Sequence, residues 1–239
     1  MAVSAHSEGA GVSLAANDLV CLSHDCVHRS GRSGHPALQD APWQRAIGYP
    51  PFDAGDIGKG GSEVVLIIFS GLPGSGKTTI ARALAKKLGA VYVRIDTAEQ
   101  TLRASGMLKA DVGPAGYMVS YGMAEDNLAL GNTVVADSVN GLKVTRDAWL
   151  SIAERAGLPA VEVEIICTDK AEHRRRVETR PTDVEGLVKP SWDEVASRNY
   201  EAWQRAPLVI DTATQDVEHS VAALISRLTE GGVRQEPAL

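Results

Sequence analysis

Hydrophobic positions along the chain fall into two kinds of run that alternate. Val64–Ser70 is a continuous apolar stretch, as expected for a strand buried on both faces of a sheet. Lys77–Leu88 follows with its apolar residues spaced along one helical face, and Gly89 marks its end. The same alternation continues along the rest of the chain, which predicts a parallel sheet covered by helices on both faces.

The pattern after Gly89 predicts four further strands and six further helical segments. The expected strands are Val91–Ile95, Thr133–Asp137, Val161–Cys167 and Leu208–Asp211. The expected helices are Thr97–Ala104, Pro114–Leu130, Thr145–Ala156, Lys170–Arg180, Ser191–Gln204 and Val217–Leu228. Thr145 is expected to cap its helix, and Ser191 with Glu194 matches a capping box. We therefore expect an α/β fold of three layers, with a five-stranded parallel sheet.

Composition changes near residue 63. Residues 1–62 are rich in Gly, Ser, His, Pro and Asp and show no sustained periodicity, so we interpret them as a disordered or loosely structured extension. Residues 63–239 are expected to form one domain. The formal net charge of −6 disfavours a nucleic-acid partner. The longest apolar run is far shorter than a membrane span, and the three cysteines fit a reducing compartment, so a cytoplasmic location is expected.

The strongest chemical motif lies between the first strand and the first helix, where residues 71–78 have the sequence Gly-Leu-Pro-Gly-Ser-Gly-Lys-Thr. They match the P-loop pattern G-x-x-x-x-G-K-[ST], whose glycines let backbone N–H groups surround phosphate oxygens. Lys77 is expected to reach the β- and γ-phosphates, and the Thr78 hydroxyl to bind Mg²⁺. The motif predicts ATP and Mg²⁺ as cofactors. The expected nucleotide-binding residues are Gly71, Pro73, Gly74, Ser75, Gly76, Lys77, Thr78 and Thr79.

Acidic residues follow the second and third expected strands. Phosphate transfer to an alcohol needs a carboxylate that orients the hydroxyl and accepts its proton. Asp96 is the expected base, and a role in capping the next helix is compatible with this. Asp137 is expected to hold Mg²⁺ with Thr78, directly or through water. Asn140 is a candidate for contact with the acceptor, with a simple turn as the equal alternative.

An arginine-rich stretch lies between the fourth and fifth expected strands, where compact kinases carry a lid. Arg176 and Arg180 are four residues apart and would share a helix face. We expect them to stabilise the negative charge that spreads over the transferring phosphate, which makes them catalytic residues beside Asp96 and Lys77. Arg198 is a weaker third candidate. The alternative for each arginine is a solvated surface position paired with a nearby glutamate.

These features together resemble a known group of proteins. The P-loop, the position of Asp96, the Val-Val-Ala-Asp-Ser-Val-Asn stretch and the arginine-rich segment are similar to small P-loop kinases of the zeta-toxin, chloramphenicol phosphotransferase and polynucleotide 5′-kinase type. Bacterial ATP-binding proteins regarded as kinases are similar too. The resemblance covers about residues 64–230. It implies a five-stranded parallel core, an aspartate base after the second strand and arginines in a helical lid.

The function expected from the sequence is the transfer of the γ-phosphate of ATP to a hydroxyl of a small molecule by a monomer or dimer. Two alternatives stay open. A polynucleotide 5′-kinase would need a basic channel, and acidic residues outnumber basic ones in residues 63–239. A non-catalytic ATP-gated switch would keep the P-loop without needing Asp96.

Overall fold

Five parallel strands form one sheet in the computed structural model, which describes residues 64–108 and 111–230. The expected extension, residues 1–62, lies outside this range. The strands are β1 (Leu66–Ser70), β2 (Val91–Arg94), β3 (Val134–Asp137), β4 (Ala160–Ile166) and β5 (Leu208–Asp211). Their order across the sheet is β2-β3-β1-β4-β5. The parallel five-stranded sheet expected from the apolar runs is confirmed.

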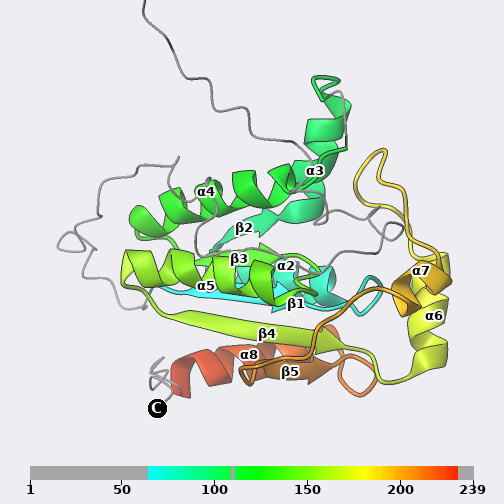
Figure 1. Ribbon diagram of the computed structural model, residues 1–239. Coiled ribbons are helices and arrows are strands. Elements are labelled where there is room, and N and C mark those ends of the chain that lie inside the picture. The colour runs from blue at the N-terminus through cyan, green and yellow to red at the C-terminus, as the bar shows by residue number, and fades with distance from the viewer. Residues whose placement is uncertain (1–63, 109–110, 231–239) are drawn as a thin grey trace, which may run out of the picture.

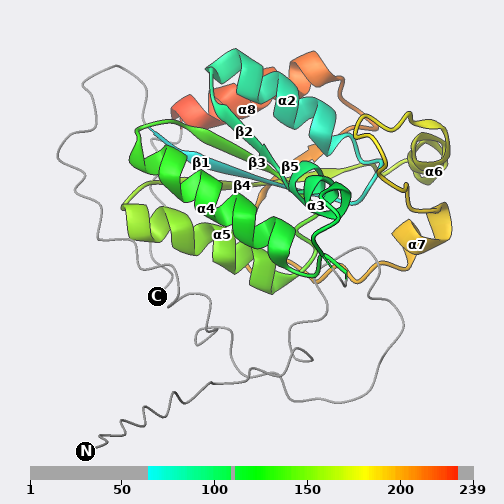
Figure 2. The same ribbon diagram turned by 90° about the horizontal axis from the view of Figure 1, so that it is seen from above.

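Helices cover both faces of the sheet. They are α2 (Lys77–Leu88), α3 (Ile95–Ala104), α4 (Ala115–Ala129), α5 (Lys143–Ala156), α6 (Lys170–Thr179), α7 (Trp192–Ala196) and α8 (Val217–Glu230). Figure 2 shows α2 and α8 on one face, and α4 and α5 on the other. In Figure 1, α3, α6 and α7 gather beyond one end of the sheet. No helix in the described part of the chain is long and apolar enough to cross a membrane.

The central strand β1 contributes side chains to two cores. Leu66 and Ile68 point to the α4 and α5 face, whereas Ile67 and Phe69 point to the α2 and α8 face, as the two-residue period of a strand requires. All four side chains are fully buried. This explains why the strand has a continuous apolar sequence rather than an alternating one.

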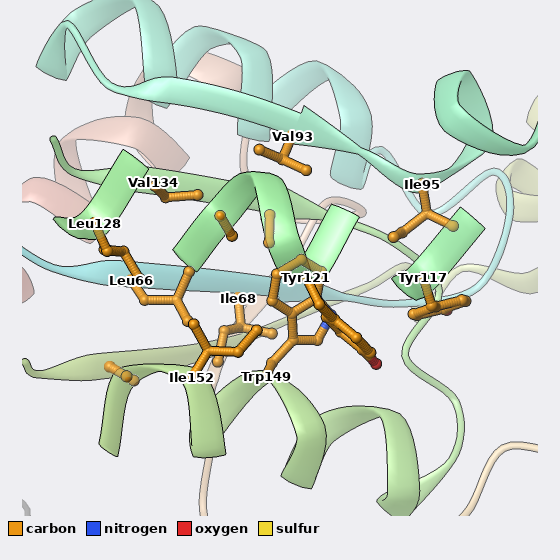
Figure 3. Close-up of a cluster of buried hydrophobic side chains, with 14 of the residues drawn as sticks. Leu66, Ile68, Val93, Ile95, Tyr117, Tyr121, Leu128, Val134, Trp149 and Ile152 are labelled. Carbon is orange, nitrogen blue, oxygen red and sulfur yellow. The ribbon is translucent and has the colours of Figure 1, made fainter. Parts of the chain in front are cut away.

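The core beneath α4 and α5 contains the aromatic residues of these helices (Figure 3). Tyr121 lies edge-on to Trp149 with ring centroids 4.6 Å apart, and Tyr117 lies 5.9 Å from Tyr121. Both tyrosines are less than a tenth exposed, so they are packing residues of this core. Trp149 is fully buried.

Two helix predictions are wrong. The helix expected from Thr145 begins at Lys143 with Leu142 as its N-cap, and the Thr145 hydroxyl donates to the Leu142 carbonyl inside the first turn. The helix expected over residues 191–204 ends at Ala196, although its capping box with Ser191 and Glu194 is present. Beyond it the chain takes an irregular path, because the guanidinium of Arg146 binds carbonyls of this segment. Tertiary contacts here override local helix propensity.

Strand register brings the expected site residues to one edge of the sheet. Asp137 at the end of β3 pairs with Phe69 of β1 on one side and with Arg94 of β2 on the other. The P-loop leaves β1 directly after Ser70, so it begins beside Asp137. In open α/β sheets ligands bind beyond the carboxyl ends of the strands, so a ligand site is expected at this edge.

Candidate active site

Residues 71–78 form a loop whose shape depends on glycine. Gly71 has φ 140°, and a Cβ atom there would lie 2.3 Å from the carbonyl oxygen of Ile165. Gly74 and Gly76 also have positive φ, in the left-handed region that favours glycine. The N-terminus of α2 follows at once, with Gly76 as its N-cap and no side-chain cap. Unsatisfied N–H groups and the positive end of the helix dipole therefore face the loop.

Lys77 adds a full positive charge to this cradle. It is only 5 % exposed, and its ammonium group makes no hydrogen bond or ion pair with the described residues. A largely buried cation without a carboxylate partner is costly unless an anion joins it. The loop, the helix N-terminus and Lys77 together form a site for phosphate groups.

The lid helix α6 packs directly on the P-loop. The imidazole Nε2 of His173 lies 2.9 Å from the carbonyl oxygen of Pro73. A Cβ atom on Gly74 would lie 2.5 Å from Cγ2 of Val177, so glycine is needed here for close packing as well as for its φ. The ring of Trp192 meets His173 edge-on, with centroids 5.3 Å apart. The helix is thus held beside the phosphate cradle.

A pocket of about 640 Å³ opens between the P-loop helix and the β5–α8 connection. It is lined by Gly76, Thr79, Ile80, Arg176 and residues 212–217. Arg176 donates to Glu172, to the Thr212 hydroxyl at 2.8 Å and to the Thr212 carbonyl at 3.1 Å. Thr212 in turn donates to the Ser75 carbonyl at 2.7 Å. The volume suits a small ligand, and the place beside the phosphate cradle suits the nucleoside part of ATP.

Asp96 lies in the first turn of α3, on the other side of the cradle from this pocket. Its Oδ2 accepts a hydrogen bond from Nη2 of Arg94 at 3.1 Å. Its charge also acts on Glu99 of α3 and Tyr117 of α4. It acts as well on Arg180 at the end of α6 and on Arg198 in the segment after α7. The helix cap is Arg94, so the capping role considered for Asp96 is wrong.

Arg180 and Arg198 bring positive charge to the surroundings of Asp96. Both are half-buried. Burial lowers the pKa of each guanidinium below its ordinary value, even though the Asp96 carboxylate acts in the opposite direction. Additional negative charge at this place would therefore be stabilised. The roles of Arg176, Arg180 and Arg198 in phosphate binding remain predictions, with Arg176 on the pocket side and the other two on the Asp96 side.

Asp137 fits the role expected of a magnesium carboxylate. Its Oδ2 accepts from the Tyr92 hydroxyl at 2.6 Å, whereas its Oδ1 is buried without a hydrogen-bond partner. Among the described residues no three His, Cys, Asp or Glu side chains cluster as metal ligands. Mg²⁺ bound to a nucleotide needs few protein ligands, because phosphate oxygens and water complete its shell. The orphaned Oδ1 and the Thr78 hydroxyl at the start of α2 are consistent with such a site.

Glu99 is a buried carboxyl group that the sequence interpretation missed. It is 4 % exposed and packs on Gly116, where a Cβ atom would lie 2.3 Å from Glu99 Cγ. Burial raises the pKa of Glu99 to about 7, although Arg103, 3.4 Å away, lowers it in part. The carboxyl group is thus partly protonated near neutral pH, and it lies one helical turn from Asp96 on α3.

This raised pKa predicts a pH-dependent stability. The folded protein keeps a proton on Glu99 that the unfolded chain releases, so the free energy of unfolding falls as pH rises from 4.5 towards 7. The free energy of unfolding of the Glu99→Gln variant should not fall in this way. Relative to the wild type, it should therefore rise by up to about 3 kcal/mol between about pH 5 and about pH 8. Urea unfolding at both pH values measures it, with the exposed Glu154→Gln as the matched control. A difference in unfolding free energy between Glu99→Gln and the wild type that does not vary with pH would contradict the raised pKa of Glu99.

Two further residues of the site were missed because only the fold brings them together. Arg94 is buried at the end of β2, and Asp183 comes from the loop between α6 and α7. The sequence signal that could have indicated Arg94 is an arginine within an otherwise apolar strand. No local pattern indicates Asp183, which pairs with Arg94 across 89 positions of sequence.

Residues 66–206 match a protein family described as AAA domain. The fold is similar to that of the APS kinase of Mycobacterium tuberculosis solved with AMPPNP and APS, with 20% identity, a TM-score of 0.53, and coverage of 71% of this chain and 99% of that one. It is also similar to Kti12 of Chaetomium thermophilum solved with ADP-AlF3, with 20% identity, a TM-score of 0.52, and coverage of 68% and 98%. A candidate kinase from Chloroflexus aurantiacus matches at 20% identity and a TM-score of 0.56, with coverage of 72% and 100%.

These likenesses show that the chain shares the α/β fold of these structures. A comparison with curated protein sequences found no match. The narrower resemblance to the zeta-toxin and chloramphenicol phosphotransferase group stays a prediction.

Proposed function

Because the chain belongs to the AAA-domain family, we propose that it is an ATP- and Mg²⁺-dependent phosphotransferase that moves the γ-phosphate to a hydroxyl of a small molecule. One observation carries this proposal. The phosphate cradle, the carboxylate of Asp137 and the carboxylate of Asp96 converge at a single edge of the sheet, through the register of β1, β2 and β3.

Each part of the site has a role in such a transfer. The P-loop amides and Lys77 hold the phosphates, and the pocket beside Thr212 receives the nucleoside. Asp96 orients the acceptor hydroxyl and takes up its proton. Arg180 and Arg198 stabilise negative charge near Asp96. Mg²⁺, held through Thr78 and Asp137, would neutralise charge on the phosphates.

The residue after Asp137 favours transfer over hydrolysis. Many ATPases place a glutamate there to polarise water, whereas this chain has Ser138. The carboxylate proposed to act on the acceptor is that of Asp96, which lies in the first turn of α3, directly after the neighbouring strand β2. The position suits the activation of an acceptor bound beside β2.

The test is transfer of labelled phosphate from γ-labelled ATP with Mg²⁺ to a pool of metabolites, antibiotics and oligonucleotides. We expect label on one class of small hydroxyl compound with the wild type, and loss of at least about 100-fold with Lys77→Ala, because the variant lacks the cation that meets the phosphates. Label on oligonucleotides alone would favour a polynucleotide 5′-kinase. Tight ATP binding without transfer to any pool member would favour the regulatory switch.

A further inference from the structure

Arg94 connects three carboxylates at the end of β2. Its Nη2 lies 3.1 Å from Oδ2 of Asp96, its Nη1 lies 2.8 Å from Oδ2 of Asp183, and its Nε lies 3.9 Å from Oδ2 of Asp137. The Arg94 side chain is only 5 % exposed. Although burial alone would lower its pKa, the bond to Asp183 and the charges of Asp96 and Asp137 raise the pKa of Arg94 above its ordinary value. Arg94 therefore remains a cation.

The three carboxylates belong to different parts of the proposed site. Asp96 is the proposed base on α3, and Asp137 is the proposed magnesium carboxylate on β3. Asp183 belongs to the lid loop, which we define as residues 180–190 between α6 and α7. A second cation, Arg82 on the P-loop helix, also binds Asp183 at 2.6 Å. The lid loop is thus attached to the floor of the site at Asp183.

A guanidinium is planar and rigid, so its two Nη atoms cannot move independently. Whatever holds one Nη fixes the direction of the other. The bond between Asp183 and Nη1 therefore limits the orientation in which Nη2 can donate to Asp96. Displacement of the lid loop would release Nη1 and leave the Arg94 side chain free to rotate away from Asp96.

We propose that Arg94 is a positioning residue that couples the lid loop to the base: the Asp183 carboxylate on Nη1 sets the orientation in which Nη2 holds Asp96. The role of Asp96 as base rests on the proposed function, whereas the mechanical coupling between the lid loop and Asp96 does not. In this proposal Arg94 acts through Asp96, which it contacts directly.

Hydrogen–deuterium exchange of the full chain without ligand tests the coupling directly. The Asp183→Asn variant should exchange at least about threefold faster in residues 180–190 and also in residues 95–100, the first turn of α3, although no substitution was made there. The matched control Asp193→Asn removes an exposed carboxylate near α6 and α7 that has no contact with Arg94, and it should change neither segment. Faster exchange in the lid loop alone would overturn the coupling.

Turnover measurements test the effect on the base. Arg94→Lys keeps the charge but cannot reach two carboxylates with a rigid fork, so we expect kcat to fall at least about 10-fold while KM for ATP stays within about threefold. Arg82→Lys alters the other cation bound to Asp183 and leaves Arg94 in place, so its kcat should fall less. Equal kcat in wild type and Arg94→Lys would overturn the positioning role.

The two sets of measurements separate the inference from the proposed function. Absence of transfer by the wild type would refute the kinase function, and the exchange of residues 95–100 in Asp183→Asn would still decide whether the lid loop controls α3. Transfer by the wild type with no response of residues 95–100 would keep the kinase function and reject the coupling.

Discussion

Replacement of Asp96 by Asn is expected to lower phosphate transfer by about 10²- to 10⁴-fold, the range typical of a lost general base. Asn has nearly the same shape and can still accept the hydrogen bond from Arg94, so the fold around it should persist. What it loses is the ability to take up the proton of the acceptor hydroxyl. ATP affinity should stay within about threefold, because Asp96 is not among the residues that line the pocket at Thr212.

Single-turnover transfer and calorimetric titration with ATP measure the two quantities separately. Lys77→Ala is the complementary variant, since it removes a phosphate contact and should weaken ATP binding as well as transfer. A full rate of transfer by Asp96→Asn would remove this residue from the mechanism. A parallel loss of ATP binding would show that the substitution disturbs the nucleotide site instead.

Replacement of Arg146 by Ala is expected to cause the largest loss of stability, about 3–5 kcal/mol. Arg146 is 1 % exposed and donates to the carbonyls of Asn140, Gly141 and Glu201 at 2.6 to 2.8 Å. Its Cζ lies 4.1 Å from the ring centroid of Trp203. Alanine would leave these carbonyls without their donor and open a cavity beside the indole ring.

Urea unfolding and thermal melting measure this loss, which corresponds to a decrease in Tm of roughly 10 °C for a domain of this size. Arg155→Ala is the matched control on the same helix, because Arg155 is half exposed and its pair with Glu125 contributes at most about 1 kcal/mol. Arg146→Lys should recover only part of the stability, since a lysine ammonium cannot reach three carbonyls in one plane. A loss below about 1 kcal/mol for Arg146→Ala would contradict the structural role.

Local sequence patterns predicted the parts of the fold that depend on neighbouring residues. The P-loop is contiguous, and its strand and helix are specified by runs of apolar residues on either side. The bounds of α2 and β5 match those expected, because Gly89 and Asp211 end these elements by local chemistry. Asp169 caps α6 by a contact of the same local kind, since its side chain accepts from the N–H groups of Ala171 and Glu172.

Distant contacts explain what local patterns did not predict. The segment after Ala196 has the composition of a helix, but Arg146 binds its carbonyls from 55 positions earlier. Arg94 and Asp183 meet only because β2 ends beneath the lid loop. The raised pKa of Glu99 arises from its burial against Gly116 on the next helix, which the charge pattern of α3 alone does not reveal.

The place of β1 at the centre of the sheet divides the site into two halves. The pocket beside Arg176 and Thr212 lies towards β4 and β5, whereas Asp96, Glu99 and Tyr117 lie towards β2 and β3. The two halves share the P-loop and α6, which carries Arg176 on the pocket side and ends at Arg180 on the Asp96 side. Acceptor preference can therefore diverge in evolution through changes in α3 and α4 while nucleotide recognition is inherited unchanged, and chimaeras that exchange these helices between relatives offer a route to new acceptors.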